Sequence, residues 1–271
     1  MRNFKLCHLI LLMKLKKAII WPDTHIPDED SKALDILYKI CSDAGPFDEV
    51  ILLGDFADFF TISSHSKIFS NRDYPLSIQR KHFLVREIEC VNARLDEIDE
   101  FFQNATKVYI AGNHEYRLER YISDKAPEVF GLLDCPSLLG LRERPHWKWI
   151  PYCPEQSYSV LGSKLLARHE PVGPNARLTA QRTSANVVFG HTHRIEEAQI
   201  VGLDGKNYTA FSFGWLGNKK ASSMNYVKSH WQWALGFGLV YVDPKTKFFY
   251  HIPIKILDNY TAFFNGKIYK A

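Results

Sequence analysis

The sequence has few cysteines and no closely spaced pair of them. Five occur in 271 residues, and none forms a C-x-x-C motif. A small, odd number of isolated cysteines argues against a disulfide framework and against a thiolate zinc site. We therefore expect a reducing, cytoplasmic setting. The cysteines are Cys7, Cys41, Cys90, Cys135 and Cys153.

The sequence also lacks a bilayer-spanning apolar run, a flexible linker and an internal repeat. The apolar stretch at residues 6–13 is too short to span a membrane, and lysines follow it rather than the small residues of a cleavage site. Because no Pro/Gly/Ser-rich segment divides the chain, we predict a single domain over residues 15–271 and no membrane partner. Residues 1–14 are expected to be an extension outside the core.

A strong charge of one sign is absent too. The 34 Lys and Arg residues and the 30 Asp and Glu residues leave a net charge of +4, which is spread along the chain. This balance permits a nucleic-acid substrate without arguing for one. The hydrophobic content of 46% is that of an ordinary globular protein, so disordered and fibrous classes are excluded.

The first half of the sequence alternates short apolar runs with segments of helical spacing. The order is typical of an α/β protein with a parallel sheet. The predicted strands are residues 17–21, 49–53 and 107–111, and the predicted helices are residues 31–42, 76–102 and 116–130.

The second half is richer in strands. An Asp204-Gly205 pair predicts a hairpin between two of them. We therefore expect an α/β fold with two mixed β-sheets packed face to face and helices outside. The predicted strands are residues 163–167, 186–189, 195–201, 207–213, 237–242 and 248–254.

Five short polar clusters directly follow predicted strands. Because loops that leave the carboxyl ends of strands converge on one crevice in open α/β sheets, residues distant in sequence can form one site there. In chain order the clusters are Asp23-Thr-His25, Gly54-Asp55-Phe-Ala-Asp58, Gly112-Asn113-His114-Glu115, Arg168-His169 and Gly190-His191-Thr-His193.

The residue types in these clusters indicate a metal site. Carboxylate, imidazole and amide ligands suit Mn, Zn, Fe or Mg, whereas no cysteine lies near these loops. Asp55 follows a glycine turn and could bridge two ions with its two oxygens. Glycines at positions 54, 112 and 190 leave room for the backbone to turn and approach an ion. One Asp-x-His alone would prove little, but five clusters in this order indicate a joint site.

Other histidines and tryptophans are expected to have structural roles. The tryptophans alternate with polar residues, which is typical of half-buried strand or loop packing, with a base-stacking platform as the alternative. The histidines outside the clusters are His8, His65, His82, His146, His230 and His251, and the tryptophans are Trp147, Trp149, Trp231 and Trp233.

The five clusters together resemble the calcineurin-like metallophosphoesterase superfamily. Its pattern is D-x-H, G-D-x-x-D, G-N-H-[DE], a later His, and G-H-x-H, and the resemblance covers residues 17–255. The wider stretches GNHEYRLERY, FGHTHR and WALGFGLVYVD are similar to stand-alone phosphoesterases of bacteria and bacteriophages. The resemblance implies a four-layer αββα sandwich with a dinuclear metal site at the carboxyl edge of the strands.

The resemblance also implies roles for individual residues. His114 would lie beside the scissile phosphate, and Asp58 would orient its ring. The cofactors would be two divalent metal ions, with Mn expected first and Fe, Zn, Ni or Mg as alternatives. The implied ligands of one ion are Asp23, His25, Asp55 and His193, and those of the other are Asp55, Asn113, His169 and His191.

The sequence departs from the family pattern at two positions. Phe59 stands where phosphoprotein phosphatases have a phosphate-binding Arg, and Glu170 follows His169 where Gly is frequent. The first departure weakens a protein-phosphatase interpretation, and the second weakens the assignment of His169. Arg117, Arg120 and Arg168 are alternative phosphate contacts, although a solvated helix surface is the simpler role for Arg120.

We therefore expect a metal-dependent phosphoester hydrolase. Two ions about 4 Å apart could activate a bridging hydroxide for in-line attack on phosphorus. The first expectation is a phosphodiesterase or nuclease acting on nucleotides or nucleic acid. The alternatives are a phosphomonoesterase, acting on phosphoproteins or small metabolites, and a non-catalytic binding scaffold on the same fold.

Overall fold

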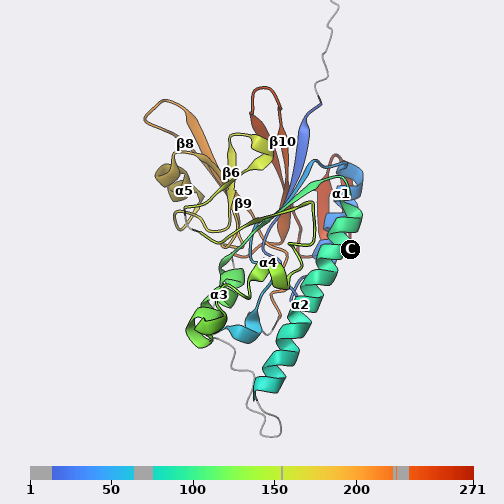
Figure 1. Ribbon diagram of the computed structural model, residues 1–271. Helices are drawn as coiled ribbons and strands as arrows, with labels where there is room; N and C mark the ends of the chain where they lie inside the picture. The colour runs from blue at the N-terminus through green and yellow to red at the C-terminus, as the bar shows by residue number, and fades with distance from the viewer. Residues whose placement is uncertain (1–13, 64–75, 154, 222–223, 225–231) are drawn as a thin grey trace, which may run out of the picture.

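The first half of the chain alternates strands and helices, as predicted. The structure, a computed structural model, describes residues 14–63, 76–153, 155–221, 224 and 232–271 (Figure 1). Strands β1, β2 and β3 are separated by helices α1 and α2, and the predicted long helix is confirmed as α2. The bounds are β1 Lys16–Trp21, α1 Ser31–Ala44, β2 Glu49–Leu52, η1 Phe60–Ile62, α2 Leu76–Phe101 and β3 Thr106–Ile110. 

The helix predicted over residues 116–130 is α3, which spans Asn113–Lys125. It starts three residues earlier than predicted and ends five residues earlier. The Glu115 side chain accepts a hydrogen bond from the Gly112 N–H at 2.7 Å. Because this contact satisfies an N–H group that a helix start leaves unpaired, the helix can begin directly after the glycine. Its first residue is therefore one of the predicted metal ligands.

One sheet has six strands in the order β11-β10-β1-β2-β3-β4. Strands β1 to β4 are parallel, and β10 runs antiparallel to both β1 and β11, so the sheet is mixed. Trp147 and Trp149 lie half-buried on β4, as the alternation of tryptophan with polar residues predicts. The additional strands are β4 Trp147–Ile150, β10 Gly236–Val242 and β11 Phe249–Lys255.

The second sheet has five strands in the order β5-β6-β7-β9-β8. It is mixed as well: β6, β7 and β9 are parallel, and β8 pairs antiparallel with β9 through the predicted hairpin. A separate hairpin joins β12 and β13. The strands are β5 Tyr158–Ser159, β6 Leu165–Arg168, β7 Asn186–Phe189, β8 Ile195–Val201, β9 Asn207–Phe213, β12 Thr261–Phe264 and β13 Lys267–Lys270.

A shared apolar cluster joins the two sheets. Ile20 and Val108 of the first sheet pack in the same buried cluster as Leu165, Val188 and Phe211 of the second. Burial of such side chains is the main favourable contribution to folding. The two mixed sheets therefore share one buried core.

Helices flank both sheets (Figure 1). Helices α1 and α2 pack on the first sheet through a second buried cluster, which includes Leu37 and Leu95. Helix α5 packs on the second sheet through Ala176 and Ala180. The predictions missed α5 because it is short and has a weak apolar period. The remaining short helices are η2 Pro127–Val129, α4 Cys135–Leu138, η3 Val160–Gly162 and α5 Ala176–Thr183.

Candidate metal centre

The five polar clusters meet at the carboxyl ends of strands from both sheets. Strands β1, β2 and β3 of the first sheet and β6 and β7 of the second supply them, because parallel strands end at a common edge. The seven predicted metal ligands and the two predicted catalytic residues all lie there, most of them buried. They are Asp23, His25, Asp55, Asp58, Asn113, His114, His169, His191 and His193.

The first ligand group consists of Asp23, His25 and His193. Its ligand atoms lie within 4.8 Å of one another. The two Nε2 atoms of His25 and His193 are 3.1 Å apart, and His193 Nε2 is 3.4 Å from Asp23 Oδ1. Three donor atoms thus converge on one point from the loops after β1 and β7.

The second group consists of Asp55, His169 and His191, with Asn113 beside them. Asp55 Oδ2 lies 3.2 Å from His169 Nε2. Asn113 Oδ1 lies 2.9 Å from His191 Nδ1 and 3.1 Å from His169 Nε2. The amide oxygen therefore faces the same space as two imidazole nitrogens.

Asp55 connects the groups. It also forms a third cluster with His25 and His114, whose ligand atoms again lie within 4.8 Å of one another. Its position between the two histidine sets suits a carboxylate that contacts two ions. These buried clusters could hold metal ions.

The chemical states of Asp55 and His25 fit divalent cations. Burial would raise the pKa of Asp55, but the positive field of His114 and His169 holds it well below its usual range, so this carboxylate is ionised. Burial and the neighbouring His114 lower the pKa of His25 to about 3. A neutral imidazole has the free lone pair that a metal ligand needs.

An unpaired buried carboxylate oxygen fits a cation as well. Within the described residues, Asp23 Oδ2 is buried without a hydrogen-bond partner. An unsatisfied buried polar atom is costly. A cation on the Asp23 carboxylate would offset that cost, so the donor set matches the predicted ions.

Strained backbone holds the ligands in place. His25, Asp55, His191 and His193 all have a positive φ, between 47° and 65°. L-residues adopt this region at a cost of about 1–3 kcal/mol, and such positions concentrate at functional sites. At Gly190, a Cβ atom would lie 2.5 Å from Asp23 Oδ2. This glycine is therefore required for the close approach, as predicted.

His169 is oriented by the backbone. Its Nδ1 lies 2.9 Å from the Leu53 carbonyl oxygen, which can only accept, so Nδ1 carries the hydrogen and Nε2 faces Asn113. Metal-binding histidines commonly donate their second ring N–H in this way. Glu170, the departure noted in the sequence, accepts a hydrogen bond from the Tyr152 hydroxyl at 2.7 Å and leaves His169 in place.

His114 belongs to a triad with Asp58 and Arg117. Its Nδ1 donates to Asp58 Oδ1 at 2.9 Å, and Arg117 Nη1 donates to the same oxygen at 3.0 Å. Burial lowers the pKa of His114, but the carboxylates of Asp55 and Asp58 outweigh it and raise the pKa. Arg117 Nη2 lies 2.7 Å from His114 Nε2. Because arginine only donates, a proton on that nitrogen requires Arg117 to turn away.

Two supporting residues escaped the sequence analysis. The buried Glu115 carboxylate accepts hydrogen bonds from the Asp55, Phe56 and Ala57 N–H groups at 2.9–3.1 Å and so fixes the loop after β2. Trp215 stacks on His193 with ring centroids 4.6 Å apart and an interplanar angle of 13°. Glu115 stands inside a recognised cluster, whereas no sequence signal pairs Trp215 with His193.

The other histidines in the described part of the chain stay outside the site. His251 stacks on Phe211 at 3.9 Å and lies 3.3 Å from Glu197, which is the structural role that was predicted. His65, His230 and Trp231 lie outside the described residues, as do Cys7, His8 and nearly all of the predicted extension. 

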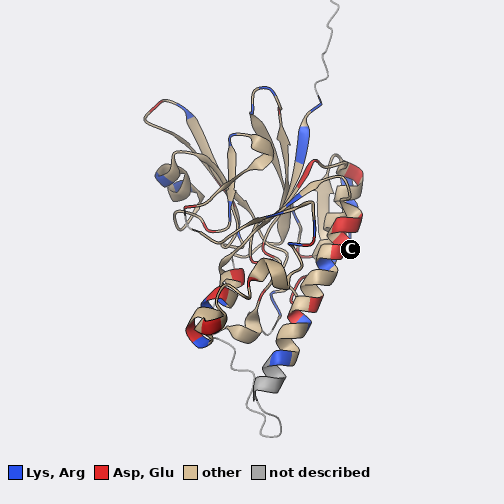
Figure 2. Ribbon diagram, in the orientation of Figure 1, with Lys and Arg blue, Asp and Glu red and all other residues tan. Residues whose placement is uncertain are grey.

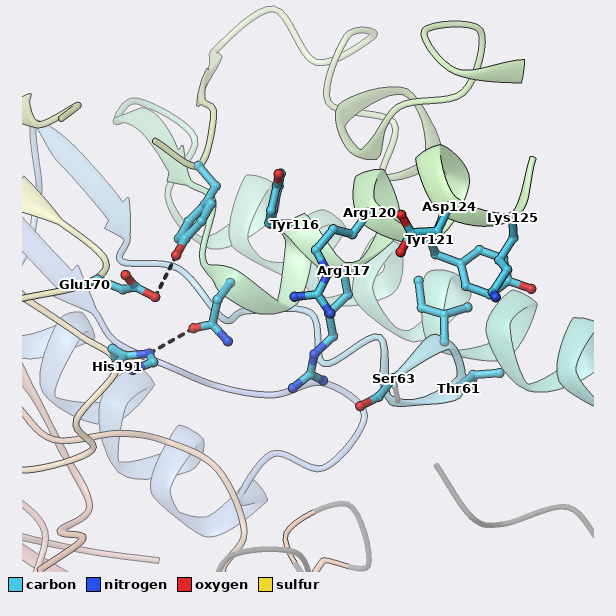
Figure 3. A pocket seen from close by; sticks show the side chains of 13 residues that line it. Thr61, Ser63, Tyr116, Arg117, Arg120, Tyr121, Asp124, Lys125, Glu170 and His191 are labelled. Carbon is cyan, nitrogen blue, oxygen red and sulfur yellow. Dashed lines mark hydrogen bonds between the residues drawn. The ribbon is translucent and has the colours of Figure 1, made fainter. Parts of the chain in front are cut away.

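A cavity of about 640 Å³ opens beside the second ligand group (Figure 3). Asn113 and His191 line it at the metal ligands, and side chains of α3 form one wall. The rest of the lining comes from η1, Ser63, Tyr152 and Glu170. A substrate that reaches the metal ligands through this cavity must pass the exposed face of α3.

Comparison with known proteins identifies no family for this chain. No family model matches the sequence, and no curated protein matches it. One solved structure aligns with it at 9% sequence identity and a TM-score of 0.45, over 89% of this chain and 99% of that chain. A likeness at that level carries no argument about function. In the described residues, no helix has the length and apolar character of a membrane span.

Proposed function

We propose that this chain is a dinuclear metal-dependent phosphoester hydrolase of the calcineurin-like metallophosphoesterase superfamily. The observation that carries the proposal is that Asp55, which clusters with His169 and His191, also clusters with His25 of the first ligand group. The flanking helices and the core shared by the two sheets support the implied four-layer αββα sandwich.

The proposed ligands draw on both sheets. When bound, two divalent cations, Mn first among them, would supply charge neutralisation at the phosphoryl oxygens and activation of water. The site residues would bind and orient these ions, and the carboxylates would balance their charge. One ion would be held by Asp23, His25, Asp55 and His193, and the other by Asp55, Asn113, His169 and His191.

His114 would protonate the leaving group, and Asp58 would orient the His114 ring. Asp58 holds the His114 ring by its Nδ1 hydrogen, so Nε2 faces the metal groups, 3.7 Å from Asp55 Oδ2. A proton on Nε2 could be donated to the leaving oxygen. Arg117, once released from Nε2, is positioned to contact a phosphoryl oxygen, which is the task of the arginine that Phe59 replaces.

A phosphodiester is the proposed substrate type. The cavity beside the ligands combines tyrosines with arginines and a lysine and is larger than one phosphoryl group requires. Phe59 is buried, with 1% of its surface exposed, and so contributes no phosphate contact. These two features favour an ester with a second organic group, as in nucleotides or nucleic acid.

The test is a substrate screen with purified protein and Mn. We expect hydrolysis of bis(p-nitrophenyl) phosphate, loss of activity with EDTA, and a fall in kcat of about 100-fold or more in His114→Ala. His146→Ala is the matched control, because His146 lies outside the site. Hydrolysis of p-nitrophenyl phosphate or a phosphopeptide alone would select a phosphomonoesterase. Metal binding without turnover of any ester would select a binding scaffold.

A further inference from the structure

The exposed face of α3 carries two tyrosines, three cations and one carboxylate. Residues spaced three or four apart share one side of a helix. The opposite side, with Glu115, Leu118 and Ile122, is buried. Figure 3 shows the side chains of this face in a row along the cavity wall. They are Tyr116, Arg117, Arg120, Tyr121, Asp124 and Lys125.

This face begins at a proposed metal ligand. Asn113 is the first residue of α3, and Lys125 is the last, so the row extends about 18 Å from the ligands at 1.5 Å per residue. That length exceeds what a single phosphoryl group can occupy. A ligand that contacts the whole row must be extended.

The cations at the far end of the row form no ion pair among the described residues. Arg117 is held by Asp58, whereas no carboxylate among the described residues forms an ion pair with Arg120 or Lys125. Both side chains are exposed, and they lie on the cavity with Arg117. Figure 2 shows both signs of charge on α3, and Asp124 is the acidic residue on this face. Because Asp58 already pairs with Arg117, this face offers two further cations, Arg120 and Lys125, against the Asp124 carboxylate, and this balance favours an anionic ligand.

The tyrosines offer flat apolar surface between these cations. Tyr116 is stacked on Tyr152 with ring centroids 5.1 Å apart and an interplanar angle of 29°, and Glu170 anchors the Tyr152 hydroxyl at 2.7 Å. Tyr121 leaves 37% of its surface exposed one turn further on. Aromatic rings alternating with cations are the means by which proteins hold single strands of nucleic acid.

We infer that the exposed face of α3 is a subsite for a single-stranded polynucleotide flanking the scissile phosphodiester. Arg120 and Lys125 contact backbone phosphates, and Tyr116 and Tyr121 stack on bases. The inference rests on the proposed function, because it takes the metal ligands next to Asn113 as the point of cleavage. The inference adds two points to the proposed function. The substrate is a strand of more than one nucleotide, and this strand lies on the α3 side of the site.

Binding without metal provides the first test. We expect Arg120→Ala/Tyr121→Ala to weaken the binding of a fluorescein-labelled DNA or RNA strand of about twelve nucleotides by about tenfold, measured by anisotropy in EDTA. The control is Lys245→Ala/Tyr250→Ala, which also removes one cation and one exposed tyrosine, from β11 and the turn before it. Similar affinities of the two double variants would overturn the inference.

Binding of an abasic strand of equal length separates the contribution of base stacking from that of phosphate charge. This strand keeps the phosphates and lacks the bases, so Tyr121→Ala should weaken binding of the normal strand and leave the abasic strand within about twofold. Equal losses on both strands would overturn the role of Tyr121. A phosphoserine peptide that competes as well as the nucleic acid would overturn the substrate class.

Turnover with Mn distinguishes this inference from the proposed function. In Arg120→Ala/Tyr121→Ala we expect the ratio of kcat/KM on the oligonucleotide to kcat/KM on bis(p-nitrophenyl) phosphate to fall about tenfold. An unchanged ratio, with both substrates cleaved, would overturn the subsite and leave the hydrolase intact. Absence of cleavage of any diester by the wild type would overturn the proposed function, and the anisotropy data would still report on the α3 face.

Discussion

Glu87 is a buried acid that lies outside the metal ligands. Its surface is 8% exposed, and Oε1 accepts a hydrogen bond from the Thr61 N–H at 3.2 Å. Oε2 has no hydrogen-bond partner in the part of the chain that the structure describes. Burial is the largest cause that raises the pKa of Glu87, from 4.5 to about 7. This single residue therefore links stability to pH.

We expect Glu87 to destabilise the folded chain as the pH rises. Between 4.5 and about 7 the folded state keeps a proton that the unfolded state has lost, so stability falls through this window. A shift of that size corresponds to about 3 kcal/mol. Glu87→Gln lacks this ionisable group. The difference in free energy of unfolding between Glu87→Gln and wild type should therefore shift in favour of the variant by about 3 kcal/mol from about pH 4.5 to about pH 8.

Urea unfolding at a series of pH values measures this difference. Glu89→Gln is the control, because Glu89 is exposed two residues further along the same helix. The prediction would be contradicted if the difference in free energy of unfolding between Glu87→Gln and wild type were the same at the lowest and the highest pH.

At the scale of elements, Glu115 fastens the start of α3 to the loop after β2. It accepts hydrogen bonds from backbone N–H groups on both segments and from the Tyr109 hydroxyl at 2.7 Å. Glu115→Gln replaces one of the two accepting oxygens with an NH₂ group. This group cannot accept a hydrogen bond from the N–H and O–H groups that face it. We expect a loss of about 2–4 kcal/mol in the free energy of unfolding. We also expect weaker Mn binding, because the loop carries Asp55.

Chemical unfolding and calorimetric titration with Mn measure the two effects. Glu119→Gln makes the same change one turn later on α3, at a half-buried position. If both variants behave alike in stability and Mn affinity, Glu115 does not position the loop.

At the scale of the whole molecule, the proposed ions cross-link the two sheets. Asp23 and Asp55 follow strands of the first sheet, and His169 and His193 follow strands of the second. Each proposed ion takes ligands from both. We therefore expect Mn at about 100 times its Kd to raise the free energy of unfolding by about 2.7 kcal/mol.

Thermal unfolding with Mn and with EDTA measures this stabilisation. Asp55→Ala removes the shared ligand and should lose the Mn-dependent rise in Tm. A rise of the same size in Asp55→Ala would show that Mn stabilises the chain from elsewhere.

The sequence alone determined most of the strands, the long helices and the polar clusters. Short apolar runs predicted most of the strands and an apolar period of 3.6 residues predicted α2, since these patterns depend on neighbours in the chain. The rule that strand ends share an edge then brought Asp23, Asp55 and His191 into one predicted site. Their residue types predicted ligands for a cation before any distance was known.

The tertiary structure alone decided which distant residues support that site. Three features of the site join segments far apart in the chain. They are the stacking of Trp215 on His193, the hydrogen bond from Arg117 to Asp58 and the cavity along α3. Sequence patterns report which face of an element is apolar. They do not report which side chain of another element lies opposite, because packing between sheets and helices sets that pairing.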